Sequence, residues 1–193
     1  GSGKTYAANK LSSELKIRCY DLDDVLWHKD DTDYTKKASE KQRDNDVKEA
    51  FNRYEQYLNE NSDSFPKSAH TLATSNWYYG FSDHKAPHDA WFEGITISEP
   101  SSGNRNEIRT VSITIKLLSA YHDGYIEFHY PEVFEYQVNA HTLGQGHGDW
   151  RYDEFRLNKK GQLVHEIEWA TYGETNNWII VASDVYHKWS KIK

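Results

Sequence analysis

The chain has 193 residues and a formal net charge of -7, with charged residues making up 27% of it. This length allows one domain with its own core, or one domain with an appended segment. No apolar run approaches the roughly 20 residues of a membrane-spanning helix, and a net negative charge is not typical of a nucleic-acid-binding protein. Membranes and nucleic acids are therefore not expected as partners.

Aromatic residues are abundant in the chain, which contains seven Trp and 14 Tyr. Disordered proteins are poor in aromatic residues, so we expect this chain to fold. Cys19 is the only cysteine, which excludes an internal disulfide bond. A single free thiol favours a reducing, cytoplasmic setting.

Residues 1–66 are predicted to form an N-terminal segment with helical character. Apolar residues recur at helical spacing over residues 5–15 and again over residues 39–61, which predicts a helix in each range. Between them, residues 17–20 are a short strand candidate that runs into the acidic sequence 21–24.

Residues 67–193 are predicted to form an antiparallel β domain. Apolar and polar residues alternate in short segments that turn signals separate, which is typical of a meander closed into a barrel or folded as a sandwich. The predicted fold class is therefore α+β: a short P-loop-like helical segment, then a β meander. Strands are predicted at residues 95–98, 111–117, 125–130, 133–138, 150–157, 163–169 and 178–182.

The sequence begins with part of a phosphate-binding motif. Gly3, Lys4 and Thr5 match the last three positions of G-x-x-x-x-G-K-[ST], and the first Gly of the motif would precede residue 1. In that motif, backbone amides bind phosphates, the Lys reaches the β- and γ-phosphates, and the Ser or Thr hydroxyl binds Mg²⁺. The alternative interpretation is a flexible pentapeptide without a ligand.

With the acidic run at Asp21 and Asp23 that follows, residues 1–50 resemble the small P-loop kinases of the adenylate-kinase-like type. The resemblance implies that Lys4 and Thr5 bind ATP and magnesium, and that Asp21 or Asp23 faces the phosphoryl acceptor. It stops after Ala50, where the second acidic strand and the Arg-bearing lid of that family have no counterpart.

Histidines at several positions of the second half raise the question of a metal site. His84 and His88 have a spacing that ligand pairs use on helices, but Pro87 between them disfavours a helix. We therefore predict no metal site, with His165 as a hydrogen-bonded core histidine and the others in loops or at the surface. The others are His84, His88, His122, His129, His141 and His147.

Three alternate glycines, Gly144, Gly146 and Gly148, form the most unusual string of the sequence. Glycines in this arrangement permit positive φ angles and a close approach of the backbone to a ligand or anion. The residues after Gly148 are strand-like rather than helical, so the string is interpreted as a connection between strands.

Four sequence blocks of the second half are similar to those of uncharacterised bacterial β-rich domains. They are residues 88–91 (HDAW), 120–126 (AYHDGYI), 146–150 (GHGDW) and 165–169 (HEIEW). This resemblance implies no catalytic residue.

The acidic, aromatic-rich composition favours a binding domain that has a protein partner and no catalytic activity of its own, because Trp and Tyr supply much of the binding energy of interfaces. An immunity-type protein, which neutralises a basic toxin or nuclease, is one form of this hypothesis. The alternative is a P-loop NTPase or small-molecule kinase that binds ATP and magnesium through residues 1–5. A metal-dependent enzyme is a third hypothesis.

Overall fold

The computed structural model describes residues 40–80, 82–140, 146–171 and 174–192. The chain divides into two compact units, Gly1–Glu60 and Asn61–Lys193. The helix predicted at residues 5–15 and the strand predicted at residues 17–20 lie outside the described residues. In the described part of the chain, no helix has the length and apolar character needed to cross a membrane.

In the first unit the described element is helix α3 (Glu40–Glu60), which confirms the helix predicted over residues 39–61. Side-chain pairs one turn apart stabilise it. Arg53 lies 3.7 Å from Glu49, and the Gln56 amide donates a hydrogen bond of 2.7 Å to Glu60.

The second unit is built on an antiparallel sheet, as predicted. Its eight strands in the described residues have the order β10-β5-β4-β1-β7-β8-β9-β6. The end strands β10 and β6 do not pair with each other, so the sheet is not closed into a barrel, and the fold is sandwich-like. The strands are β1 (Trp91–Ser98), β4 (Ser112–Leu118), β5 (Gly124–Tyr130), β6 (Val133–Gln137), β7 (Asp149–Leu157), β8 (Leu163–Thr171), β9 (Glu174–Ala182) and β10 (Tyr186–Lys191).

The sheet bends where β1 meets β7. Among the described residues these two strands share one residue pair, Trp91 with Asp149. Register shifts lie beside this joint on both strands, between Phe92 and Gly94 and between Trp150 and Tyr152. Because bulges bend a strand and increase its twist, they let the sheet fold into two four-stranded halves.

The core lies against the inner face of the bent sheet and is rich in aromatic residues. Alternate residues of β4 and β5 are fully buried, which is the period of two that the sequence shows over residues 111–117. The Phe128 and Trp150 rings stack at 5.1 Å. Large aromatic side chains bury the most apolar area for each residue, so they dominate the stability of a domain this small. The buried residues of β4 and β5 are Ile113, Ile115, Leu117, Ile126, Phe128 and Tyr130.

A short helix, α4 (Lys67–Ala73), precedes the sheet and packs near β7 and β10. It follows Pro66, and the Asp184 carboxylate accepts a hydrogen bond of 3.0 Å from the Ala69 amide in its first turn. The segment after α4 is tied to β7 by two backbone hydrogen bonds, from Asp89 N to Trp150 O (2.8 Å) and from Trp150 N to Ala90 O (3.0 Å). These bonds place residues 82–90 at the joint of the sheet.

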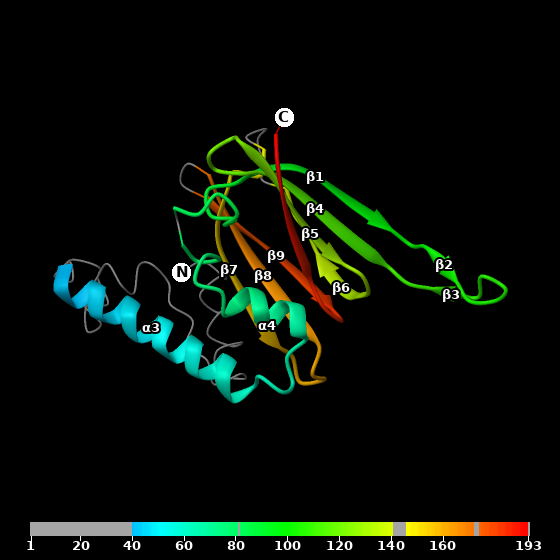
Figure 1. Ribbon diagram of the computed structural model, residues 1–193, viewed down its shortest axis with the longest axis horizontal. Coiled ribbons are helices and arrows are strands. Elements are labelled where there is room, and N and C mark those ends of the chain that lie inside the picture. Colours follow the sequence, from blue (N-terminus) through cyan, green and yellow to red (C-terminus); the bar gives the residue numbers. More distant parts are fainter. Residues whose placement is uncertain (1–39, 81, 141–145, 172–173, 193) are drawn as a thin grey trace. The chain divides into compact units, whose positions relative to one another are not determined.

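The β1–β4 hairpin continues into an arm formed by β2 (Ser101–Ser102) and β3 (Ile108–Arg109), which extends away from the rest of the sheet (Figure 1). An ion pair between Arg109 and Glu99 joins its two sides. The hydroxyls of Ser98 and Ser112 lie 2.9 Å apart at its base.

Candidate functional site

The residues that the P-loop interpretation names lie outside the described part of the chain. These are Gly3, Lys4, Thr5, Asp21 and Asp23. Among the described residues, no group of three or more His, Cys, Asp and Glu side chains is arranged to hold a metal ion.

Histidine and aromatic side chains gather at the bend of the sheet, in an arrangement that the sequence analysis did not predict. They come from the loop at residues 82–90, from the turn at residues 119–123 between β4 and β5, and from the first residues of β1 and β7. We call this set the aromatic–histidine patch; it consists of Trp91, Tyr121, Tyr152, His84, His88 and His122.

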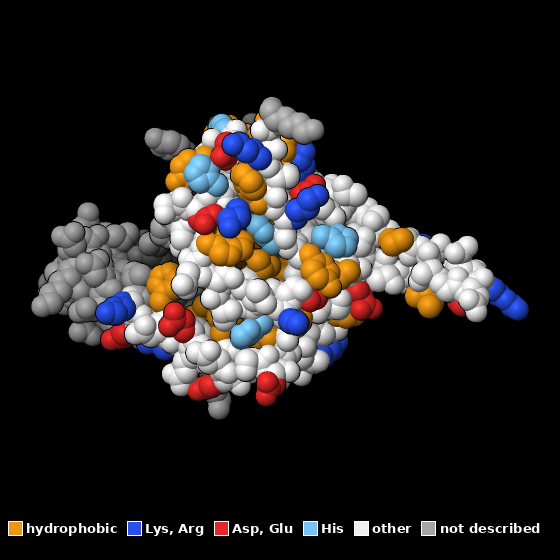
Figure 2. Space-filling model, in the orientation of Figure 1, with side chains coloured by type: hydrophobic (Ala, Val, Ile, Leu, Met, Phe, Trp, Pro, Cys, Tyr) orange, Lys and Arg blue, Asp and Glu red, His pale blue; other side chains and the backbone are white. Residues whose placement is uncertain are grey.

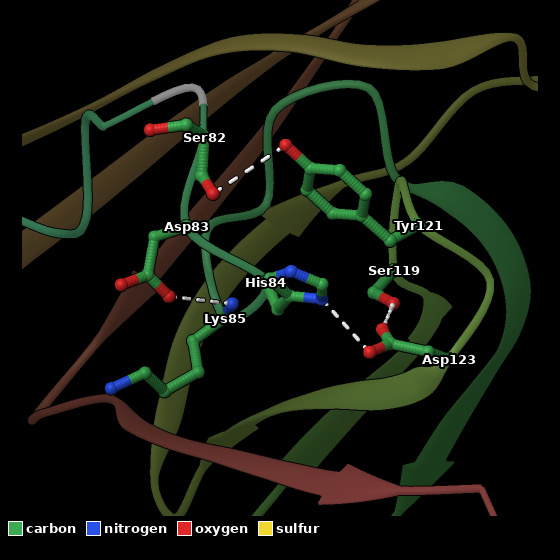
Figure 3. Close-up of polar contacts among 7 residues, drawn as sticks. All are labelled: Ser82, Asp83, His84, Lys85, Ser119, Tyr121 and Asp123. Atoms are coloured by element: carbon green, nitrogen blue, oxygen red, sulfur yellow. Dashed lines mark hydrogen bonds and ion pairs between the residues drawn. The ribbon is translucent and has the colours of Figure 1, made fainter.

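His84 joins the loop to the turn (Figure 3). Its Nδ1 donates a hydrogen bond of 2.8 Å to Oδ2 of Asp123, and the Ser119 hydroxyl donates one of 3.2 Å to Oδ1 of the same carboxylate. The His84 ring stacks on Tyr121 with 4.1 Å between centroids. The Tyr121 hydroxyl in turn reaches the backbone oxygen of Ser82 at 3.4 Å. Two segments far apart in the sequence are thus held together by polar and ring contacts.

The charge of Asp123 supports this junction. Loss of solvent would raise its pKa, but the hydrogen bonds from His84 and Ser119 outweigh that effect and hold the pKa of Asp123 below its ordinary value. The carboxylate is therefore ionised at neutral pH and able to accept both bonds.

The Ser119, Asp123 and His84 side chains do not form a catalytic triad. In a triad the histidine lies between the serine and the carboxylate, so that it can take the serine proton. Here the carboxylate lies between the other two residues, and Ser119 donates to Asp123. The geometry holds a loop in place and does not activate a nucleophile.

Trp91 is the largest exposed ring of the patch. It is 51% exposed, and its ring meets that of His122 edge-on at 4.5 Å. His122 has a φ of 57°, in the left-handed region that non-glycine residues rarely adopt. The backbone N–H of His122 donates to Ser119 O at 2.8 Å, which closes the turn and fixes the imidazole beside the Trp91 ring.

His88 and Tyr152 form the third pair of the patch. Their rings lie edge-on at 6.2 Å, and Nδ1 of His88 lies 3.1 Å from the Asp89 carboxylate. Asp89 also has a positive φ, 59°. Positive φ at non-glycine residues is associated with functional sites; here it occurs at His122 within the patch, at Asp89 beside it, and at Asn106 in the arm between β2 and β3.

Figure 2 shows histidine side chains lying next to hydrophobic ones at several places on the visible face of the molecule. Tyr121 and Tyr152 are 49% and 46% exposed, so with Trp91 the patch presents three rings to solvent. Each ring contacts a histidine, and these contacts restrict its rotation.

A separate polar network lies inside the core and is centred on Asp153. Its carboxylate accepts hydrogen bonds from the Tyr78 hydroxyl (2.7 Å), Trp150 Nε1 (3.0 Å) and His165 Nε2 (3.0 Å). Nδ1 of His165 accepts a further bond of 2.6 Å from the Tyr130 hydroxyl. His165 is fully buried, which confirms its prediction as a hydrogen-bonded core histidine.

Burial, with the nearby Asp153 charge, raises the pKa of Tyr78 and of Tyr130 well above the usual value of a tyrosine. Both hydroxyls therefore keep their protons and act as hydrogen-bond donors. Since every member of the network is partnered, its role is to fix the packing of the core.

His129, His147 and two of the glycines have structural positions, whereas His141 lies outside the described residues. The His147 ring packs against Phe92 at 4.3 Å and against Trp178 at 5.0 Å. Gly146 and Gly148 have positive φ angles of 71° and 80°, which glycine residues permit, while Gly144 lies outside the described residues. Nδ1 of His129 and the Thr114 hydroxyl lie 2.9 Å apart and share a hydrogen bond. None of these positions extends the patch.

No protein-family model, no curated protein and no solved structure matches the sequence. The two resemblances drawn from sequence blocks remain expectations.

Proposed function

We propose that residues 61–193 form a protein-binding module whose contact surface is the aromatic–histidine patch. The observation that carries this proposal is the exposure of Trp91, Tyr121 and Tyr152 at one end of the sheet, each in contact with a histidine ring. Exposed Trp and Tyr residues supply most of the energy at the centre of protein interfaces.

The restraint on these rings also supports binding. A side chain that is already fixed loses little conformational entropy when a partner covers it. Hydrogen bonds to Asp123 hold the loop that carries His84, and the closed turn holds His122 beside Trp91. The patch is preorganised, which favours affinity for a folded partner or for an extended protein segment.

An immunity-type protein that neutralises a basic toxin or nuclease is one form of this function, and its support is the net charge of -7. A cytoplasmic setting, which the single cysteine favours, belongs to the same proposal. The proposed module has no catalytic role of its own.

The test compares proteins captured from a lysate of the source organism by the tagged full chain and by three variants. Trp91→Ala and Tyr152→Ala remove rings of the patch, and we expect each to lose the captured protein. Tyr186→Ala is the control, because Tyr186 is 49% exposed on β10, outside the patch. Retention by the patch variants, or equal loss by the control, would contradict the proposal.

A second candidate function is ATP-dependent phosphoryl transfer or hydrolysis by the first unit. Its support is the match of Gly3, Lys4 and Thr5 to the P-loop motif, together with the acidic residues Asp21 and Asp23. ATP and magnesium would then be the cofactor and metal of the chain. Because the two functions use different units, each is tested by substitutions that leave the other unit unchanged.

A further inference from the structure

We propose that the aromatic–histidine patch binds a cationic protein segment, with its exposed rings and the aspartates beside them receiving Lys or Arg side chains of the partner. This inference rests on the proposed binding function and names the chemistry of the partner. Two observations support it: the carboxylates around the rings, and the cations of the chain that already lie over rings here.

Carboxylates surround the exposed rings. Asp149 is the register partner of Trp91 and is exposed, and the Asp89 side chain is 65% exposed beside His88. Asp123 lies next to His122 in the turn. A cation placed over an exposed ring at this surface would therefore also lie near a carboxylate, and opposite charges steer partners together.

Cations of the chain itself already lie over aromatic rings in this region. The Arg151 guanidinium is 5.5 Å from the centroid of the Tyr152 ring, and the Lys85 ammonium is 5.2 Å from that of Trp77. Both distances lie within the range of cation–π attraction. Arg151 also contacts Glu168 at 3.7 Å, so ring and carboxylate act together on one guanidinium. The partner's cations would use the same two kinds of group.

The carboxylates are spread over the surface and do not converge. Among the described residues, no three potential ligands gather around one point where a metal ion could bind. Asp89 and Asp149 flank Trp91 from two different segments, the loop and β7. Charges arranged in this way match several cationic side chains along a segment better than they match a single ion.

The test uses a fluorescein-labelled peptide of alternating Gly and Arg, with Gly-Gln and Gly-Glu peptides of equal length for comparison. Fluorescence anisotropy with the full chain at low salt gives the affinity. We expect the Gly-Arg peptide to bind at pH 7.5 and to bind more tightly than either comparison peptide. Absence of Gly-Arg binding, or equal binding of the Gly-Gln peptide, would overturn the inference.

Matched variants locate the peptide on the surface. Trp91→Ala and the double variant Asp89→Asn with Asp149→Asn are each expected to weaken Gly-Arg binding about three- to fivefold, the range of one exposed cation–π or ionic contact. The control is Glu132→Gln with Glu135→Gln, which removes two charges from exposed positions outside the patch. If the control weakens binding as much as the aspartate variant, the effect is one of net charge and the inference fails.

The outcome also separates this inference from the function on which it rests. If Trp91→Ala loses the captured protein while the aspartate variant keeps both that protein and the peptide, the patch is a binding surface for a partner that is not cationic. If Trp91→Ala changes neither the captured protein nor the peptide, the proposed function and the inference fail together.

Discussion

At the scale of single residues, Asp153 is the acceptor at the centre of a buried polar network. Three buried donors, on Tyr78, Trp150 and His165, give their hydrogen bonds to its carboxylate, which is 4% exposed. A buried donor without an acceptor costs about 1–3 kcal/mol. The carboxylate therefore stabilises the fold mainly by keeping its neighbours partnered.

Replacing Asp153 tests this account. Asp153→Ala leaves three donors without an acceptor, so the free energy of unfolding should fall by about 3 kcal/mol or more. Urea unfolding followed by tryptophan fluorescence measures the change. Asp63→Ala, at an exposed position, is the control and should change stability by less than about 0.5 kcal/mol. If Asp153→Ala lowers the free energy of unfolding as little as the control does, the network is not needed for stability.

Glu154 lies on the opposite face of β7 and gives the fold a second dependence on a carboxyl group. Burial of its carboxyl raises the pKa of Glu154 from its ordinary value of 4.5 to about 7, Arg156 opposes this shift, and the Glu166 and Asp153 charges add to it. The folded state thus binds the proton more tightly than the unfolded state does. The free energy of unfolding should therefore decrease as the pH rises from about 4.5 to above 7.

The variant Glu154→Gln removes this titration. We expect it to be about as stable as the parent near pH 4.5 and more stable by about 1–2 kcal/mol at pH 8.5. Glu166→Gln is the contrasting variant, because Glu166 accepts a hydrogen bond of 2.8 Å from the nearly buried Arg156 and its loss should destabilise the protein. Denaturant unfolding at the two pH values measures both. A Glu154→Gln variant with the same pH dependence as the parent would contradict the assignment.

Among the strands, the pairing of β5 with β10 depends on a position where a side chain has no room. Gly124 begins β5 and is buried, and a Cβ atom placed on it would lie 2.5 Å from Cε2 of Trp189 on β10. The Trp189 ring fills the space that the missing side chain leaves. Gly124 follows Asp123 directly, so this contact also supports the turn of the patch.

Gly124→Ala should therefore force the Trp189 ring to move, and should lower the free energy of unfolding by about 1–3 kcal/mol. Gly94→Ala is the matched control, since a Cβ at Gly94 in β1 meets no atom within 4 Å. Thermal unfolding ranks the two variants, and a change in the fluorescence of Gly124→Ala reports the movement of Trp189. Equal melting temperatures for the two variants would refute the packing argument.

The strands that the sequence predicts well are those with one clearly buried face. Apolar and polar residues alternate without interruption over residues 111–117, and the apolar residues of this range that lie in β4 are buried. β10 was not predicted, because Lys188 and Lys191 make it polar, as is common for a strand at the edge of a sheet. The bend was missed for a similar reason: it depends on bulges near Gly94 and Arg151, and a bulge interrupts the alternation on which a strand prediction rests.

The patch could not be predicted from sequence because its members lie far apart in the chain. His84, Tyr121 and Tyr152 come together only through the antiparallel pairing and the bend. The sequence places His165 correctly in the core because His165 shares one face of an alternating strand with Leu163 and Ile167. Local patterns indicate whether a side chain is buried, whereas a surface site depends on pairings between distant segments.

Considered as a whole molecule, the chain combines two units with different proposed chemistry. The first carries the P-loop residues Gly3, Lys4 and Thr5, and the second carries the patch. A nucleotide function predicts that the full chain binds ATP with magnesium, and that Lys4→Ala weakens this binding at least about tenfold, because the lysine contacts the β- and γ-phosphates.

Calorimetry with ATP and MgCl₂ measures this binding, and Lys67→Ala, which removes an equal charge from the second unit, is the control. The Gly-Arg peptide should bind Lys4→Ala as it binds the parent, because the patch lies in the other unit. Identical ATP titrations of Lys4→Ala and the parent would leave the chain with its binding function alone. ATP binding that Lys4→Ala removes, with peptide binding unchanged, would establish a protein with two functions, one in each unit.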